Sequence, residues 1–405
     1  MLILPLFPAL GALSLFLVMV AVWQRHYRQM VSDRVNWAWG VLASWLILNS
    51  ALAYQPSEAW LGLANFLPFL GLFAALRLVI DKPQELKRLA WSIVIPSLPI
   101  VILGLGQLYG GWSTPQWLGN ILGWNLVPQG EPPGRMSSVF IYANFLAVYL
   151  AIAFILTCGL WIDTWQQRKL IKKPLGLLSG LMFILLVNSV GLVLTSSRSA
   201  WGIAFFSLMA FAIYLGWRWL VYAATAFTSV ILWASFAPSW GGEWLRPIVP
   251  AFFWARLSDQ MYPDRPVATL RTTQWEFCLD LIKQRPLTGW GLRNFTPLYE
   301  SKMNVWFGHP HSLFLMLAVE IGLIATVLLL GIVGWIIAKA ILAKLRSGDL
   351  EEICFADRDR WGVIFFSYLV AFTGCILFNL FDVTIFDLRA NTLSWILLAA
   401  IAKKH

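Results

Sequence analysis

Long apolar runs separated by short polar stretches dominate this chain. Each run is close to the roughly 17–25 residues that a helix needs to cross a bilayer. The runs cover residues 2–22, 36–54, 59–80, 90–109, 138–161, 175–195, 199–215, 218–236, 312–338, 361–381 and 388–402. This pattern predicts an all-α, polytopic membrane protein of about eleven transmembrane helices, which forms a single integral membrane domain over residues 1–405.

The composition agrees with a membrane protein and removes several other classes. Hydrophobic residues make up 59% of the chain and charged residues only 12%, against roughly 25% charged residues in soluble proteins. The sequence contains neither a P-loop nor a GxGxxG motif, so neither ATP-driven transport nor a dinucleotide enzyme is indicated. The four cysteines have no CxxC spacing, so a disulfide or metal framework is not expected.

Lysine and arginine are concentrated in alternate loops. The basic loops cover residues 25–34, 81–88, 163–174 and 339–360. If the spans simply alternate, these loops all lie on one side, and the positive-inside bias identifies that side as the cytoplasm. We therefore read the net charge of +10 as a topology signal instead of a nucleic-acid signal, with the N-terminus outside and the C-terminus in the cytoplasm. Arg77 then reads as an anchor at the cytoplasmic end of its span, where a lysine should serve equally well.

Two substantial segments fall on the outside under this topology, residues 110–137 and 237–311. The second is about 75 residues long and too rich in tryptophan for disorder. Residues 269–283 have apolar positions at helical spacing, which predicts an amphipathic helix at the membrane surface. The stretch 285–291, with one proline and two glycines, predicts a turn directly after it.

Charged and titratable residues at the external helix ends are the candidate functional residues. An arginine there is usually a snorkelling anchor, and this reading stays open for Arg135. Arg198 lies in a hydroxyl-rich turn too short to extend far into water, which favours a functional role. His309 and His311 stand together just before an apolar run, where ionisable groups are costly and usually functional. Arg271, at the start of the amphipathic helix, completes the set.

Glu320 follows in the same apolar run, nine residues after His311. At about 100° per residue this offset places the two side chains on opposite sides of a helix. Direct contact between them is therefore not expected. Glu320 either supports the site or forms a buried hydrogen bond to a neighbouring helix.

These residue types suit transfer of a group from a pyrophosphate. Guanidinium groups bind phosphate oxygens in a bidentate manner. A histidine that stays neutral among cations can accept a proton from a hydroxyl group. Because the arginines supply the positive charge that Mg²⁺ would otherwise provide, no metal and no cofactor are expected.

Four sequence blocks, in order, resemble the O-antigen ligase and O-antigen polymerase superfamily. They are Gly134-Arg135 with Asn144 to Leu150; Thr195 to Ala200; Arg271-x-x-x-Trp275 with Pro286 to Phe295; and His309-Pro310-His311-Ser312 with Glu320-x-Gly322. The fourth block departs from the family pattern, because Ser312 stands where asparagine is usual.

The resemblance implies a GT-C-like fold in the bacterial inner membrane. It further implies that a glycan moves from a polyprenyl-pyrophosphate carrier, undecaprenyl pyrophosphate, to an acceptor hydroxyl at the outer face. Arg198 and Arg271 would bind the pyrophosphate, with Arg135 as a further candidate. His311 would be catalytic or contact phosphate, with His309 beside it, and Asn144 and Glu320 would support the site. The expected partners are the lipid-linked donor, a glycan, lipid or protein acceptor, and membrane lipids, but no nucleic acid.

The same resemblance supplies a competing hypothesis. Related cyanobacterial proteins have been described as inorganic-carbon accumulation proteins, so the chain could transport bicarbonate or another anion. A secondary transporter commonly shows repeated halves with broken helices that meet at mid-membrane, and no internal repeat is visible here. The polar candidates lie at one face, which favours the glycosyltransferase. A non-catalytic partner in envelope assembly is a third reading.

Overall fold

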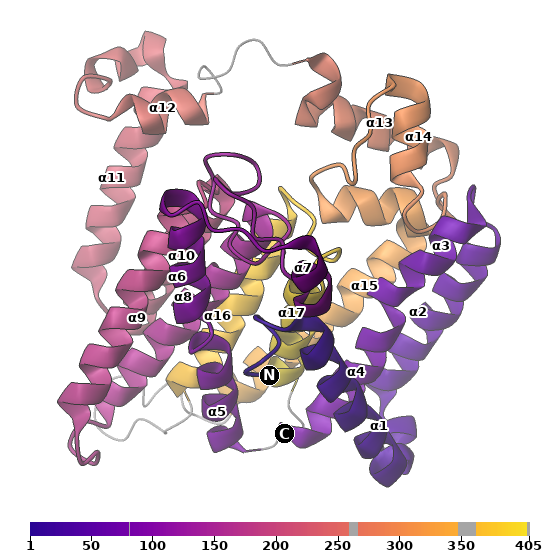
Figure 1. Ribbon diagram of the computed structural model, residues 1–405, viewed down its shortest axis with the longest axis horizontal. Helices are drawn as coiled ribbons and strands as arrows, with labels where there is room; N and C mark the ends of the chain where they lie inside the picture. Colours follow the sequence, from indigo (N-terminus) through magenta and orange to yellow (C-terminus); the bar gives the residue numbers. More distant parts are fainter. Residues whose placement is uncertain (81, 259–265, 347–361, 403–405) are drawn as a thin grey trace. The chain divides into compact units, whose positions relative to one another are not determined.

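The computed structural model describes residues 1–80, 82–258, 266–346 and 362–402, and they form helices joined by turns and loops (Figure 1). No strand occurs among these residues. The predicted all-α class is therefore confirmed. Most of the basic loop predicted at 339–360 falls outside the described residues.

The helices follow the apolar runs closely. Their bounds are α1 (Pro8–Ser32), α2 (Arg34–Ala51), α3 (Pro56–Gly62), α4 (Leu67–Val79), α5 (Pro83–Val94), α6 (Ser97–Tyr109), α7 (Gln116–Leu122), α8 (Ala143–Gln166), α9 (Pro174–Leu194), α10 (Arg198–Tyr214), α11 (Arg218–Phe236), α12 (Ala251–Leu257), α13 (Arg271–Gln284), α14 (Phe295–Met303), α15 (Leu313–Arg346), α16 (Gly362–Asn379) and α17 (Leu388–Ile401). Short 3₁₀ turns are η1 (Leu63–Asn65), η2 (Pro238–Trp240), η3 (Gly242–Leu245) and η4 (Val267–Thr269).

Eight segments in the described part of the chain are long and apolar enough to cross a membrane. They correspond to eight of the predicted runs, with α3–α4 and α5–α6 each counted as one segment. The other three predicted runs coincide with α2 and with the shorter apolar helices α10 and α17. The protein is thus a multi-pass membrane protein, while the count of about eleven spans stays a prediction.

The chain divides into two compact units. One comprises Met1–Ala204 and Trp275–His405, and the other comprises Phe205–Gln274. The smaller unit contains most of α10, then α11 and α12. In it the Arg246 guanidinium lies 4.2 Å from the centre of the Trp254 ring, and the Trp233 indole N–H donates to the Trp240 carbonyl at 2.9 Å.

The core of the larger unit surrounds α8. This helix is apolar on all sides and is buried along nearly its whole length, as expected of a helix enclosed by others. It packs against α9, α16 and α5, and α8 and α16 run side by side in Figure 1. Gly159 permits a close approach of α16, because a side chain there would overlap Ser367 of that helix.

The predicted amphipathic helix is confirmed as α13, but its apolar face does not face lipid. Phe277, Cys278 and Leu281 are buried against Phe295 and Tyr299 of α14, and Val319 of α15 completes this cluster. The apolar spacing that suggested a membrane-surface helix thus reflects packing inside the protein.

The ends of the helices that carry basic loops gather at one end of the larger unit. Lys87 of α5 pairs with Asp163 of α8 at 2.6 Å, and the Tyr368 hydroxyl of α16 donates to the Leu86 carbonyl at 2.9 Å. The predicted basic loops at 81–88 and 163–174 therefore share one side, as the charge pattern requires.

Arg77 lies at this same end, and the structure corrects its interpretation. It is buried, pairs with Asp33 at 3.1 Å and donates to the Ala402 carbonyl at 2.9 Å. A lysine cannot reproduce both contacts with one compact ammonium group, so Arg77 is a structural clamp and not an exchangeable anchor.

Helix α15 is interrupted at Gly322, where φ is +79° and ψ is +165°. At the break the Trp290 N–H donates to the Val319 carbonyl at 2.9 Å and the Gly291 N–H to the Glu320 carbonyl at 2.8 Å. The Leu323 N–H turns to the Pro286 carbonyl at 2.8 Å. The predicted turn after α13 therefore docks into the break and fixes the short segment 313–321 that leads back to the histidines.

Candidate functional site

The His-Pro-His segment lies just outside α15. The helix starts at Leu313, and the Leu315 N–H faces the Ser312 hydroxyl at 3.5 Å, as in an N-cap. Serine and asparagine both serve well as N-caps, so the departure at Ser312 preserves the local structure. His311 thus precedes the helix, as expected, and its φ of +52° lies in the left-handed region. Such strained backbone in a non-glycine residue is typical of functional sites.

The two histidines are held together as a pair. The His311 backbone N–H donates to His309 Nδ1 at 3.2 Å, and the two rings stand nearly perpendicular, with centres 4.7 Å apart. The Trp275 indole of α13 donates to the Pro310 carbonyl at 3.0 Å. Helix α13 therefore positions the segment that carries both histidines.

Both histidines face Asp382, in the short loop between α16 and α17. His309 Nε2 and His311 Nδ1 each lie 3.6 Å from Asp382 Oδ1. Burial alone would raise the pKa of this carboxyl, but the side chains of His311 and His309 and the Val383 N–H hold the pKa of Asp382 below its ordinary value. The carboxylate is consequently ionised at neutral pH, and it faces both histidines.

A hydrogen-bond chain connects Asp382 with the first sequence block. Asn144, near the start of α8, donates through Nδ2 to Asp382 Oδ2 and accepts from the Arg135 guanidinium through Oδ1. Arg135 also donates through Nε to the Thr195 carbonyl at 2.8 Å. Arg135, Asn144 and both histidines thus converge, as proposed from the sequence.

The remaining predicted residues have different positions. Arg198 begins α10 with an exposed side chain, three residues after the Thr195 carbonyl that binds Arg135. Glu320 is buried away from this network and faces the Phe295 N–H at 3.5 Å, so it holds the start of α14. Arg271 begins α13 within the smaller unit, and its part in the site stays a prediction.

Asp382 is the important residue that sequence reasoning overlooked. It lies in the gap between two predicted spans, in the stretch Phe381-Asp382-Val383. A buried ionisable group beside a span is a functional signal. The sequence does not show that this loop lies close to the histidines in the folded protein.

His309, His311 and Asp382 also form the type of cluster that binds a metal ion, with their ligand atoms within 4.8 Å of one another. The tautomer of His309 argues against that use. Because His309 Nδ1 accepts the His311 N–H, neutral His309 carries its proton on Nε2, which is the atom that faces Asp382. A metal at Nε2 would need the proton on Nδ1, against the His311 N–H. This hydrogen bond favours an aspartate–histidine pair over a metal site.

The histidine pair opens into a cleft of about 900 Å³, the size of a small-molecule site. Its walls come from the α2–α3 turn, the start of α8, the 293–300 segment and the loop before α17. The polar lining includes Gln55, Glu58 and Arg293, while Tyr142 and Trp306 are among several aromatic residues. The site therefore offers acid–base groups beside a broad surface of mixed polarity.

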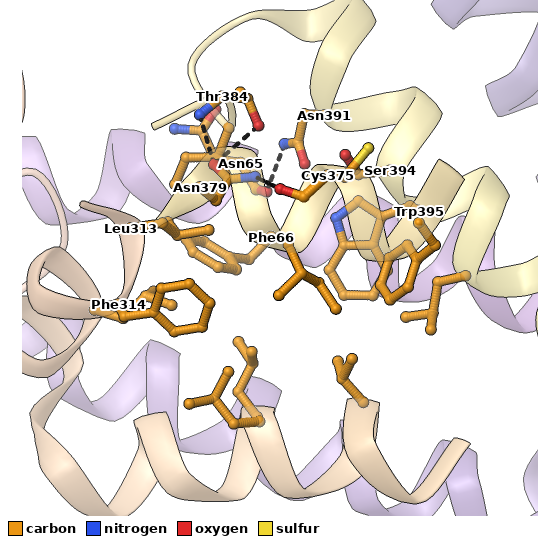
Figure 2. A pocket seen from close by; sticks show the side chains of 18 residues that line it. Asn65, Phe66, Leu313, Phe314, Cys375, Asn379, Thr384, Asn391, Ser394 and Trp395 are labelled. Atoms are coloured by element: carbon orange, nitrogen blue, oxygen red, sulfur yellow. Dashed lines mark hydrogen bonds between the residues drawn. The ribbon is translucent and has the colours of Figure 1, made fainter. Parts of the chain in front are cut away.

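A smaller apolar pocket of about 140 Å³ lies between α15, α16 and α17 (Figure 2). Leu313, Phe314 and Trp395 supply apolar lining, while Asn379, Thr384 and Asn391 form a polar group at one side (Figure 2). The Asn391 side chain donates to the Asn65 carbonyl at 3.0 Å. Asn65 lines both this pocket and the large cleft, so the two spaces are neighbours.

Together these features define a multi-pass membrane protein with a histidine–aspartate site at the end opposite its basic loops. Residues 181–330 match the family model described as O-antigen ligase. This match supports the O-antigen ligase and polymerase superfamily over residues 181–330, and the resemblance found in the sequence is confirmed. The matched segment includes three of the four blocks, while Arg135, Asn144 and Asp382 lie outside it. No curated protein sequence matches the chain.

Proposed function

We propose that this protein is a metal-independent glycosyltransferase of the ligase or polymerase kind, with a GT-C-like fold. It transfers a glycan from a polyprenyl-pyrophosphate carrier to an acceptor hydroxyl at the outer face of the inner membrane. The family match supports glycan transfer in this general sense. The observation that carries the finer proposal is the shared carboxylate of Asp382, which faces both histidines at 3.6 Å beside the cleft.

His311 acts as the general base in this proposal. With Nδ1 turned to Asp382, its proton is favoured on that atom, and Nε2 keeps a lone pair for the acceptor hydroxyl. As the acceptor O–H bond breaks, the proton moves to Nε2 and the oxygen bonds to the anomeric carbon of the donor. The bond between that carbon and the phosphate oxygen breaks, and its electron pair leaves with the pyrophosphate. Asp382 stabilises the imidazolium that forms.

The arginines stabilise the pyrophosphate as it leaves. Arg198 presents an exposed guanidinium near the turn that binds Arg135, and planar guanidinium groups match phosphate oxygens. Arg271 is proposed for the same role. The apolar pocket next to the cleft suits part of the polyprenyl chain, because most of its lining is hydrocarbon.

An anion transporter is the alternative, but no specific observation favours it. Binding of bicarbonate would explain the arginines and no other feature of the site. It would leave the Asp382–histidine pair and the large mixed cleft without a role. The arrangement therefore supports transfer chemistry better than passage of an anion.

The decisive experiment measures donor consumption by purified protein in lipid nanodiscs, with a polyprenyl-pyrophosphate glycan and candidate acceptors. Wild-type protein should transfer the glycan with or without EDTA. His311→Ala should lower the rate by about 10²–10⁴-fold, the usual contribution of a general base, while His309→Ala should have the milder effect. Full activity in His311→Ala would remove the base assignment, and loss of wild-type activity in EDTA would remove metal independence.

The same preparation can test the alternative directly. Vesicles that contain the protein should show no bicarbonate uptake above protein-free vesicles. Uptake without any glycan transfer would replace the proposed function by transport.

A further inference from the structure

One wall of the cleft is built by two segments far apart in the sequence. The Tyr54 N–H donates to the Trp290 carbonyl at 2.9 Å, and the Gln55 N–H donates to the Asn294 side chain at 2.7 Å. At Gly62 of α3, an added side chain would meet Leu292. The α2–α3 turn and the 290–294 segment are thus fitted closely to each other and form a preorganised surface.

The central feature of this wall is an ion pair that lines the cleft. Arg293 Nε lies 2.9 Å from Glu58 Oε2, and the two side chains are 42% and 35% exposed. Arg293 has a φ of +60°, a conformation rarely adopted by residues with side chains. The backbone is therefore held in an unfavourable conformation that aims this guanidinium at Glu58.

The positive charge of Arg293 and the negative charge of Glu58 cancel, so the pair suits a neutral polar ligand better than an anion. A pyrophosphate would gain from Arg293 but be repelled by Glu58. A neutral hydroxyl group can donate to Glu58 Oε1 while a neighbouring hydroxyl accepts from the Arg293 Nη atoms, both of which lie beyond the Nε–Oε2 contact. Adjacent hydroxyls of this kind are the characteristic edge of a sugar ring.

Aromatic side chains in the same cleft fit the other surface of a sugar. Trp306 is 68% exposed, and Tyr142, Phe145 and Phe386 also line the cleft. The C–H face of a pyranose is apolar and can pack on aromatic rings, which are common in ligand sites for this reason. The cleft thus provides both kinds of contact within one space.

We propose that Glu58 and Arg293 form a sugar subsite that recognises adjacent hydroxyls on the terminal monosaccharide of the acceptor. The role as acceptor site rests on the proposed function, whereas sugar binding itself does not. Glu58 lies outside the family-matched residues 181–330. Acceptor choice then depends partly on α3.

Sugar binding is tested by saturation-transfer NMR on the full chain in nanodiscs. The probes are methyl glucoside, methyl galactoside, methyl mannoside and the monodeoxy derivatives of each. At least one hexoside should bind to wild type, and removal of one recognised hydroxyl should weaken binding about tenfold, the usual effect of a hydrogen bond to a charged group. Glu58→Gln should bind the hexoside and that deoxy derivative almost equally, which loss of a merely structural contact would not produce.

A matched ion pair on α13 provides the control. Asp280 and Lys283 are exposed and lie 3.2 Å apart, and neither lines the cleft. Asp280→Asn should keep the wild-type discrimination between hexoside and deoxy derivative. The double variant of Glu58→Gln with Arg293→Gln should lose binding, and unchanged binding by it would overturn the proposal. Binding of serine or tyrosine peptides in place of every hexoside would also overturn it.

The two proposals fail in different ways. Glycan transfer without sugar binding that depends on Glu58 would remove the subsite and leave the proposed function intact. If the protein binds a hexoside through Glu58 but has no transfer activity, the subsite stands and the proposed function is removed.

Discussion

At the residue scale, the identity of each cation matters more than its charge. Arg198 is proposed to bind pyrophosphate through a planar fork that lysine lacks. Arg198→Lys should therefore lower glycan transfer roughly 10–100-fold, the loss expected for one strong charged contact. Transfer rates in nanodiscs would measure this effect.

The matched control is Arg168→Lys, at an exposed arginine at the opposite end of the larger unit. Its activity should equal wild type, because within the described part of the chain the Arg168 guanidinium contacts Trp165 at its own helix end. Wild-type transfer by Arg198→Lys would rule out bidentate pyrophosphate binding at this position. Arg77→Lys is unsuitable as a control, since its buried contacts predict a loss of stability.

Asp382 predicts how stability depends on pH. A carboxyl whose pKa is lowered in the folded protein stabilises the fold above its ordinary pKa of about 3.9, and this contribution disappears as the pH falls through the lowered value. Asp382→Asn should therefore lower Tm clearly at neutral pH, with a difference from wild type that shrinks as the medium is acidified. Thermal unfolding in nanodiscs across the acidic range would show this. A constant difference at every pH would mean that its charge contributes nothing.

Sequence reasoning identified most of the residues that converge here, and its omissions have a physical reason. Arg135, Asn144, His309 and His311 each stand out because polar groups next to spans are costly. Asp382, in a loop, and Glu58, in α3, are equally polar but lie far along the chain from those residues. Which loops meet at one end of a helix bundle depends on packing between helices, and apolar periodicity does not encode it.

At the element scale, the hydropathy pattern predicts the helices well but misses the interruption in α15. The run 312–338 is apolar throughout, and nothing in its periodicity changes at Gly322. The break depends on the docked turn 286–291, which supplies partners for the exposed backbone groups. Similarly, the apolar face of α13 predicts the helix correctly without showing that protein covers it.

Gly322→Ala should be strongly destabilising, by about 3 kcal/mol or more. Its φ and ψ are essentially restricted to glycine, and an added methyl group would overlap the Leu287 backbone. Gly331→Ala and Gly334→Ala provide controls in the same helix, because an added methyl group meets nothing within 4 Å at either position. These two variants should keep the wild-type Tm, and an equally stable Gly322→Ala would show that the break is not required.

At the scale of the whole molecule, the charge pattern and the contacts agree on two distinct ends of the larger unit. The ion pairs Arg77–Asp33 and Lys87–Asp163 connect neighbouring helices at their ends beside the basic loops. The histidine–aspartate site lies at the other end. The sequence predicted this two-sided arrangement because the charge pattern repeats in every second loop. It could not predict the division into two compact units, which depends on long-range contacts.

The proposed orientation places the site outside the cell. A cysteine at Ser113 or Ser258 should react with a membrane-impermeant reagent added to intact spheroplasts, whereas one at Lys173 should react only after lysis. Mass spectrometry of the labelled protein gives the readout. The opposite pattern at all three positions would invert the topology and move the proposed transfer to the cytoplasmic face.

The interruption of α15 also bears on how the chain enters the membrane. The carbonyls of Val319, Glu320 and Ile321 bind the Trp290 and Gly291 N–H groups and the Trp45 indole, and a lipid environment offers no substitute for such partners. Trp45, Trp290 and Gly291 all precede α15 in the chain, so these donors are synthesised before the carbonyls that they satisfy. A nascent chain that ends soon after α15 thus already contains every one of these donors, so biogenesis of this half-helix need not wait for α16 or α17.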